Sequence, residues 1–418
     1  MSTTASSSAA SNTDRPFPWV GLSTLAIAIF VLVTSEFLPT GLLPAMARDL
    51  GVSESQIGFL VTIFAGTVVV SAAPLAALTR QYSRKSLLLI VLVVFALSNL
   101  LAAIAPNYEV LVGARVLGGL AHGLFWAVAG AYSGYLVPRH QIARAVAVTN
   151  AGGTTAFVLG VPLGTALGFA LGWRAAFGVI AASVLILVVM VWKFLPSVSH
   201  HVSLATGEIR LPARRDPTLP AVLFVCVLVA LIMTGHNVFY TFIAPFLLDT
   251  SGFSTESLSI LLFLYGGAGA IGLVLAGVIG SRYPRGGLYG MLIAVIVAVL
   301  TIAAFAEVSI VVVVALVVWG AAFGGLPTLL QTRLLHVASP NVRDVGAALL
   351  TTAFNIGIGG GAAIGAVLFA RTSPTVLPMV EAGALGLAII ALLIYEARRR
   401  SQGLSLVTRP VPIVGTER

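Results

Sequence analysis

The sequence has little charge, few acids and almost no cysteine. Only 9% of its 418 residues are charged, whereas 58% are hydrophobic. A soluble globular protein of this length could not hide so much apolar surface in its interior. The composition therefore excludes that class and favours a protein with many membrane-spanning segments. The single cysteine, Cys226, lies in an apolar run and has no partner, which excludes disulfides within the chain.

The distribution of basic residues speaks against nucleic-acid binding, and the absence of catalytic motifs speaks against an enzyme. Lys and Arg outnumber Asp and Glu by 23 to 14, and they occupy short loops between apolar runs, which speaks against nucleic acid as a partner. There is no His-Glu-x-x-His, no Gly-x-Ser-x-Gly and no pair of acids within a span. The Gly-rich stretch 355–365 is not followed by Lys-Ser or Lys-Thr, so it is no phosphate loop. We expect no enzyme activity and no metal site.

Long apolar runs predict an all-α polytopic membrane protein. A span needs roughly 20 mostly apolar residues, and the polar breaks define twelve of them. Their expected limits are 20–43, 56–78, 86–105, 109–136, 144–171, 175–195, 219–248, 257–280, 287–305, 308–332, 345–370 and 376–395. Both termini then lie on one side, together with 19 of the 23 Lys and Arg residues. The positive-inside rule places that side in the cytoplasm, with the protein in the cell (plasma or inner) membrane.

The two halves of the sequence partly repeat at an offset of 201 residues. "GVSESQIGFL" at 51–60 falls on "GFSTESLSIL" at 252–261, and Gly66 falls on Gly267. The repeat predicts two pseudo-symmetric six-helix bundles with the substrate near the midplane between them, and a monomer that forms the whole pathway. We expect a disordered cytoplasmic tail at 1–18, bundles at 19–195 and 219–396, a cytoplasmic linker at 196–218 and a cytoplasmic tail at 397–418.

Four stretches carry a resemblance to a known family. They are "SEFLPTGLLPAMARDLGVSESQIG" (35–58), "LAALTRQYSRK" (75–85), "ARVLGGLAHG" (114–123) and "GVPLGTALG" (160–168). The chain resembles the drug:proton antiporter branch of the major facilitator superfamily, near the sugar-efflux and chloramphenicol-resistance type exporters. The resemblance implies export of small amphipathic molecules, with the proton gradient as energy source and no cofactor.

Two of these stretches are associated with conformational change in the family. In the inner loop between spans two and three, Arg80, Arg84 and Lys85 match the basic positions, but Thr79 stands where the family pattern has Asp. We therefore do not expect the salt bridge that this Asp makes to a neighbouring helix in the family, and we expect the loop to lock the outward-open state less through that charge pair.

The fifth-span stretch resembles the antiporter motif, with Gly160, Pro162 and Gly164 at its centre and Val161 inserted between Gly and Pro. Pro162 removes a backbone donor and bends the helix. The glycines, four residues apart, line one face and allow close helix contact. Helix packing alone is the alternative role.

Glu36 is the only charged residue between Val20 and Leu43, and the only acid that we expect well inside a span. A charge at the centre of a spanning helix costs about 2.5–3.5 kcal/mol on insertion scales. At the helical rise per residue, Glu36 lies about 11 Å below the outer end of span one and Arg115 about 9 Å below that of span four. We therefore predict that the two form an ion pair in which Glu36 takes up and releases the coupling proton. A static pair that fixes helix register is the alternative.

Other polar and aromatic side chains are predicted near this pair. His122 and Trp126 share the face of Arg115 on span four, taking 100° per residue. His122 is either a proton relay or a structural histidine, and Trp126 either stacks on substrate or packs. Asn237 falls on Glu36 in the repeat. In spans seven and eleven, the candidates for the substrate cavity are His236, Asn237, Tyr240 and Asn355.

The substrate class stays open between small amphipathic drugs and sugars such as arabinose. A sugar site would need several amide or acid side chains, and the spans contain few, which favours an apolar substrate. An uncoupled facilitator, and a receptor that binds without transporting, are further alternatives.

Overall fold

The computed structural model describes residues 17–79, 81–137, 141–196, 216–339 and 342–401. Within these ranges all regular structure is helical, and twelve helices are long and apolar enough to cross a membrane. The predicted all-α fold with twelve spans is confirmed.

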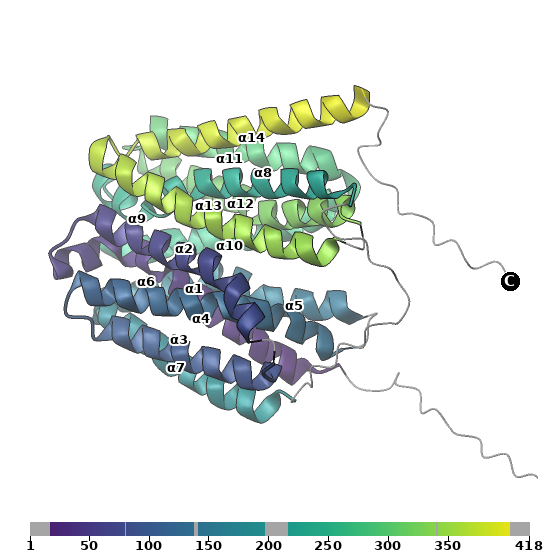
Figure 1. Ribbon diagram of the computed structural model, residues 1–418. Coiled ribbons are helices and arrows are strands. Elements are labelled where there is room, and N and C mark those ends of the chain that lie inside the picture. Colours follow the sequence, from purple (N-terminus) through teal and green to yellow (C-terminus); the bar gives the residue numbers. More distant parts are fainter. Residues whose placement is uncertain (1–16, 80, 138–140, 197–215, 340–341, 402–418) are drawn as a thin grey trace, which may run out of the picture.

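The chain forms two halves that lie side by side (Figure 1). The N half contains α1 (Trp19–Leu50), α2 (Glu54–Leu78), α3 (Arg84–Ala103), α4 (Tyr108–Tyr135), α5 (Ile142–Thr155), the π-helical turn η2 (Ala156–Gly160), α6 (Val161–Leu171) and α7 (Trp173–Phe194). The C half contains α8 (Leu219–Tyr240), α9 (Ile243–Pro245), η4 (Phe246–Thr250), α10 (Thr255–Arg282), α11 (Pro284–Ala304), α12 (Ser309–Val337), α13 (Arg343–Arg371) and α14 (Val376–Ser401).

The helical bundle has two ends. The terminal face is the end at which α1 begins and α14 ends, and the opposite face is the end at which α1 meets α2. The predicted tails and linker lie mostly outside the described residues, but α14 continues to Ser401, beyond the expected bundle end at 396.

The first span is longer than predicted. We expected it to end at Leu43, before Pro44, but α1 runs on to Leu50 with Pro39 and Pro44 inside it. Prolines are tolerated in spanning helices because neighbouring groups satisfy the backbone carbonyls that they free. The helix ends at Gly51, whose φ of 65° is left-handed and whose N–H caps the last turn.

Spans five and seven are not continuous α-helices. Span five changes to a π-helical turn at Ala156–Gly160, which ends two residues before Pro162, and this proline lacks the N–H of a regular helix. Span seven was expected to run unbroken from 219 to 248. Its α-helix ends at Tyr240, and two short turns, α9 and η4, complete it. Its register therefore differs from that of α1 in the other half.

The glycines of span five set the position of α1. A Cβ at Gly160 would overlap Thr34, and one at Gly164 would lie 2.6 Å from a methyl group of Leu38. These partners are also four residues apart, so one face of α5–α6 packs along one face of α1. This close approach fixes the rotation of α1 next to Glu36.

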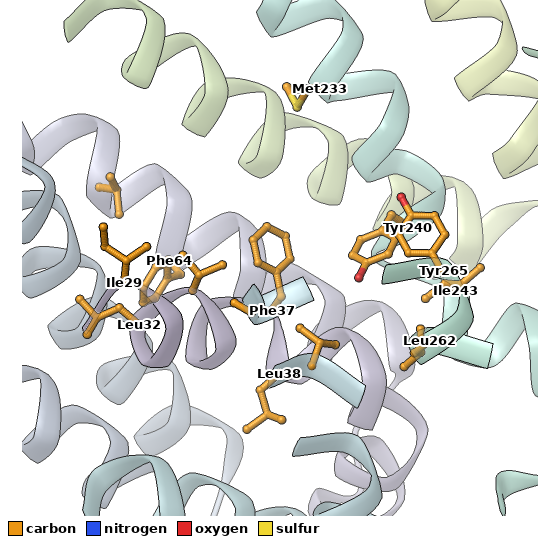
Figure 2. Packing of buried hydrophobic residues seen from close by; sticks show 14 of the residues in the cluster. Ile29, Leu32, Phe37, Leu38, Phe64, Met233, Tyr240, Ile243, Leu262 and Tyr265 are labelled. Atoms are coloured by element: carbon orange, nitrogen blue, oxygen red, sulfur yellow. The ribbon is translucent and has the colours of Figure 1, made fainter. Parts of the chain in front are cut away.

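Contacts between the halves run from the opposite face to the middle of the bundle. Thr62 on α2 donates to the carbonyl of Gly359 on α13 at 2.9 Å. The ring of Tyr240 on α8 lies 6.2 Å from that of Phe37 and 6.3 Å from that of Phe157. Figure 2 shows Phe37 on α1 and the two tyrosines, Tyr240 and Tyr265, across from it. The halves therefore meet through hydrophobic rings at this level.

Candidate functional site

The backbone of α1 is held at Ser35 and Glu36 by two other helices. In a regular helix the N–H of residue 39 would donate to the carbonyl of Ser35, but Pro39 has no N–H. The guanidinium of Arg115 on α4 replaces it, with Nη1 donating to the Ser35 carbonyl at 3.1 Å and Nη2 to the Glu36 carbonyl at 3.0 Å. The Ser35 hydroxyl donates to Asn99 Oδ1 on α3 at 2.6 Å.

The predicted ion pair between the Arg115 guanidinium and the Glu36 carboxylate is therefore wrong. Arg115 lies beside Glu36, as the matching depths implied, but its donors bind backbone carbonyls rather than the carboxylate. Its guanidinium carbon also lies 4.2 Å above the ring of Phe64, a cation–π contact. The Ser35 carbonyl, which Pro39 leaves without a backbone donor, is a strong acceptor at a fixed place. It therefore binds the guanidinium that we predicted to bind the Glu36 carboxylate.

The carboxylate of Glu36 faces His122 instead. Glu36 is 5% exposed, and its Oε2 lies 3.4 Å from Nε2 of His122. The indole N–H of Trp126 donates to the same nitrogen at 2.7 Å. The structure thus brings together four sequence candidates from α1 and α4: Glu36, Arg115, His122 and Trp126. The ring of Phe64 covers this group, 5.1 Å from the imidazole.

Two buried nitrogens of this group have no partner within the described residues. They are Nε of Arg115 and Nδ1 of His122. Buried donors without a hydrogen bond are rare and unfavourable, so they mark a place where water or a ligand group would be stabilised.

A second acid group, which sequence reasoning missed, lies in the C half. Glu381 on α14 is 0% exposed. Its Oε1 lies 3.1 Å from Nδ1 of His236 on α8 and accepts a hydrogen bond from the indole N–H of Trp319 on α12 at 3.0 Å. The expectation that Glu36 is the only acid well inside a span is wrong. The signal was present, because Glu381 stands in an apolar run between Pro378 and Gly383.

Aromatic rings enclose His236. Phe323 stacks on one side with a centroid distance of 3.4 Å, and Tyr240 is also stacked on it at 5.1 Å. The hydroxyl of Tyr265 lies 3.5 Å from Nε2. Tyr265 and Phe323 are the residues 201 positions after Phe64 and His122. Equivalent positions of the two halves therefore contribute to the group around Glu36 and to the group around Glu381. The two glutamates themselves are not at equivalent positions.

The remaining cavity candidates are buried among helices. Asn237 donates to the Met233 carbonyl of its own helix at 2.9 Å, and Asn355 donates to the Thr351 carbonyl of α13 at 3.0 Å. A Cβ at Gly361 would lie 2.7 Å from Cβ of Asn237, so that amide faces α13 closely. Neither asparagine contacts Glu36 or Glu381 through a hydrogen bond of its amide.

A surface cavity lies away from both of these sites, between the halves. A cavity of about 380 Å³ at the opposite face is lined by residues of both halves, including Arg48, Glu54 and Asp249. Its lining contains none of the predicted cavity residues, because in this conformation those side chains pack against one another.

The conformational motifs are placed in part. Arg80 lies outside the described residues. Arg84 begins α3, and Lys85 donates to the Trp192 carbonyl of α7 at 2.7 Å, which ties these two helices of the N half. Pro162 is buried at the start of α6. Gly160 and Gly164 pack against α1, as described above.

A family model and several solved structures match this chain. A family model described as Major Facilitator Superfamily matches residues 25–362. Among solved structures, a bacterial homologue of the human lysosomal transporter Spinster, inward-facing and unoccupied, is 17% identical with a TM-score of 0.69 and covers 93% of this chain and 98% of its own.

Two further structures are similar. The nucleoside transporter NupG is 17% identical with a TM-score of 0.68, covering 90% of this chain and 99% of its own. The human organic anion transporter MFSD10 is 15% identical with a TM-score of 0.66, covering 90% of this chain and 100% of its own. At such identities the likeness concerns the fold.

Proposed function

Because the chain belongs to the Major Facilitator Superfamily, we propose that it is a proton-coupled transporter that exports small amphipathic molecules, of the drug and antibiotic class, by alternating access. Family membership and twelve apolar helices make it a multi-pass membrane transporter rather than an enzyme. The proton coupling, the direction and the substrate class are the proposal.

The observation that carries the proposal is the buried carboxylate of Glu36 against His122. The indole of Trp126 already donates to Nε2 of His122, so this nitrogen is an acceptor. Oε2 of Glu36 lies 3.4 Å from the same nitrogen. Two acceptors facing each other repel, and this repulsion is weaker when the carboxyl group is protonated than when it is ionised. The geometry therefore favours a proton on Glu36 in this conformation.

Arg115 supports release of that proton in another conformation. Its guanidinium is a permanent charge fixed on the α1 backbone beside Glu36. Once water reaches the carboxylate, a nearby cation stabilises its ionised form. Glu36 would thus hold a proton while water is excluded and release it once water enters. This is the behaviour that exchange of protons against substrate requires.

The placement of the contacts between the halves supports alternating access. They join the halves from the opposite face to the middle, through Thr62 with Gly359 and through Tyr240 with Phe37. With the termini in the cytoplasm, as the charge bias predicts, the opposite face is external and this conformation is closed to the outside. We place the protein in the cell membrane and infer that a monomer transports.

The test is substrate-driven proton movement in proteoliposomes. Wild type, Glu36→Gln and Glu256→Gln are compared with a panel of amphipathic antibiotics and pentoses. Glu256 is an exposed acid in the first turn of α10 and serves as the matched control. We expect antibiotics to drive proton movement in wild type and in the control, and the Glu36 variant to lose it.

Other outcomes identify the alternatives. Proton movement driven by pentoses alone would make the protein a sugar exporter. Substrate flux without proton movement, unchanged by the Glu36 substitution, would make it a facilitator and reduce Glu36 to a structural residue.

A further inference from the structure

The two buried glutamates of α14 have opposite surroundings. Glu396 pairs with Arg333 of α12, with Nη2 2.9 Å from Oε1. Because arginine is a permanent cation, that pair is neutral without a bound proton. Among the residues that the structure describes, Glu381 has no such partner. Its Oε1 meets His236 and Trp319, and its Oε2 has no hydrogen-bond partner there.

The groups that face Glu381 come from three helices. α8 contributes His236 and, behind it, Tyr240; α10 contributes Tyr265; and α12 contributes the neutral indole of Trp319. α11 and α13 also pack near α14. Their described Lys and Arg residues stand near helix ends and none acts on Glu381: Arg285, Arg343 and Arg371.

Charge balance then requires a proton in this group. A carboxylate that is 0% exposed and has no permanent cation beside it is strongly unfavourable. One proton makes the group neutral, either as a carboxylic acid beside neutral histidine or as a carboxylate beside an imidazolium. In either form the pair holds one proton.

Tyr240 separates this group from the boundary between the halves. Within the C half its ring stacks on His236 and contacts Tyr265 and Trp319. On the other side it contacts Phe37 and Phe157 of the N half. Phe37 follows Glu36 directly in the chain. If the halves separate at this level, Tyr240 loses both N-half partners and water gains a route to His236. Figure 2 shows Tyr240 and Tyr265 together, across from Phe37.

We propose that Glu381 and His236 form a second proton-binding site, whose proton exchanges with water when the halves separate at Tyr240. The site goes beyond the proposed export function, because binding of a proton here requires no substrate. It lies wholly within the C half, whereas the Glu36 site lies wholly within the N half. Each half of the transporter therefore carries one titratable group close to their common boundary.

The test is an infrared pH titration of the purified protein in lipid nanodiscs, without substrate. It follows the C=O band of protonated carboxyl groups and the bands of imidazolium. We expect Glu381→Gln to remove one titrating group that Glu36→Gln retains. Glu396→Gln is the matched control, a buried glutamate of the same helix with a guanidinium partner, and should leave that group unchanged.

Two more variants keep the test decisive if Glu381→Gln fails to fold. Trp319→Phe removes the indole donor and should shift the midpoint of the same titrating group, whereas the Glu396 control should not. Phe37→Ala opens the boundary beside Tyr240 and should accelerate hydrogen–deuterium exchange of the group several-fold. The proposal is overturned if folded Glu381→Gln keeps every titrating band of wild type, or if neither Trp319→Phe nor Phe37→Ala alters the group. Because no substrate is added, these results do not depend on whether export occurs.

Discussion

Replacing Arg115 by methionine, in three different backgrounds, tests why an arginine is buried in α4. The structure assigns its Nη1 to the Ser35 carbonyl that Pro39 leaves without a donor. If this is correct, Pro39→Ala supplies a backbone N–H to the same carbonyl, and the arginine becomes less necessary. The quantity of interest is the change in the free energy of unfolding on Arg115→Met, with and without Pro39.

The magnitude follows from the contacts. Each hydrogen bond from the charged donor is worth about 1.5–3 kcal/mol, and the desolvated contact with Phe64 adds about 2 kcal/mol or more. Burying the charge opposes them by about 2.5–3.5 kcal/mol. The single substitution Arg115→Met therefore measures only the difference between the favourable contacts of the arginine and the cost of burying its charge. The double-mutant cycle cancels the burial cost and isolates the Ser35 bond, for which we expect a coupling of about 1.5–3 kcal/mol.

The assay is reversible unfolding in bicelles by steric trapping, with Pro44→Ala as the matched background. Pro44 frees the carbonyl of Thr40 in the same way, but Arg115 binds the carbonyls of Ser35 and Glu36. The cost of Arg115→Met should fall in the Pro39→Ala background and stay constant in the Pro44→Ala background. Equal costs in all three backgrounds would refute the reasoning.

Three further substitutions test other contacts. Gly160→Val should destabilise the protein by about 1–3 kcal/mol in the same unfolding assay, and Thr34→Ala should recover part of the loss because a Cβ at Gly160 meets Thr34. Arg333→Met should cost about 2–4 kcal/mol by leaving buried Glu396 without its cation, and adding Glu396→Gln should restore most of it; a double variant no better than the single one contradicts this. Thr62→Val removes a bond between the halves worth about 0.5–1.5 kcal/mol, so spin-label distances across the opposite face should show about two- to twelve-fold more of the open form; an unchanged distribution would count against a role in closing that face.

The spans and a close helix contact of span five could be predicted because they depend on local patterns, whereas the partner helix α1 could not. Twelve apolar runs of sufficient length predicted twelve helices, and glycines four residues apart in span five predicted a close helix contact, which the structure shows against α1. The end of α1 could not be predicted, because a proline stops a helix only where nothing satisfies the carbonyl that it frees.

The acid groups could be predicted only in part. Depth along two helices placed Arg115 beside Glu36, yet it could not decide which oxygen the guanidinium binds, since this depends on the angle at which α4 meets the backbone of α1. Glu381 was overlooked because it lies near the start of its span, where an acid looks like an end-of-helix residue. The arrangement of α8, α12 and α14 leaves it fully buried.

By itself the sequence determined that this protein crosses a membrane twelve times, that its halves partly repeat and that its first span carries an acid. The number of spans follows from the transfer of each segment from water to lipid, which is a sum over neighbouring residues. Only the tertiary structure decided which acid meets which histidine and which carbonyl receives the arginine. Such pairings join residues that are far apart in the chain, and a hydrogen bond tolerates only small errors in distance and direction.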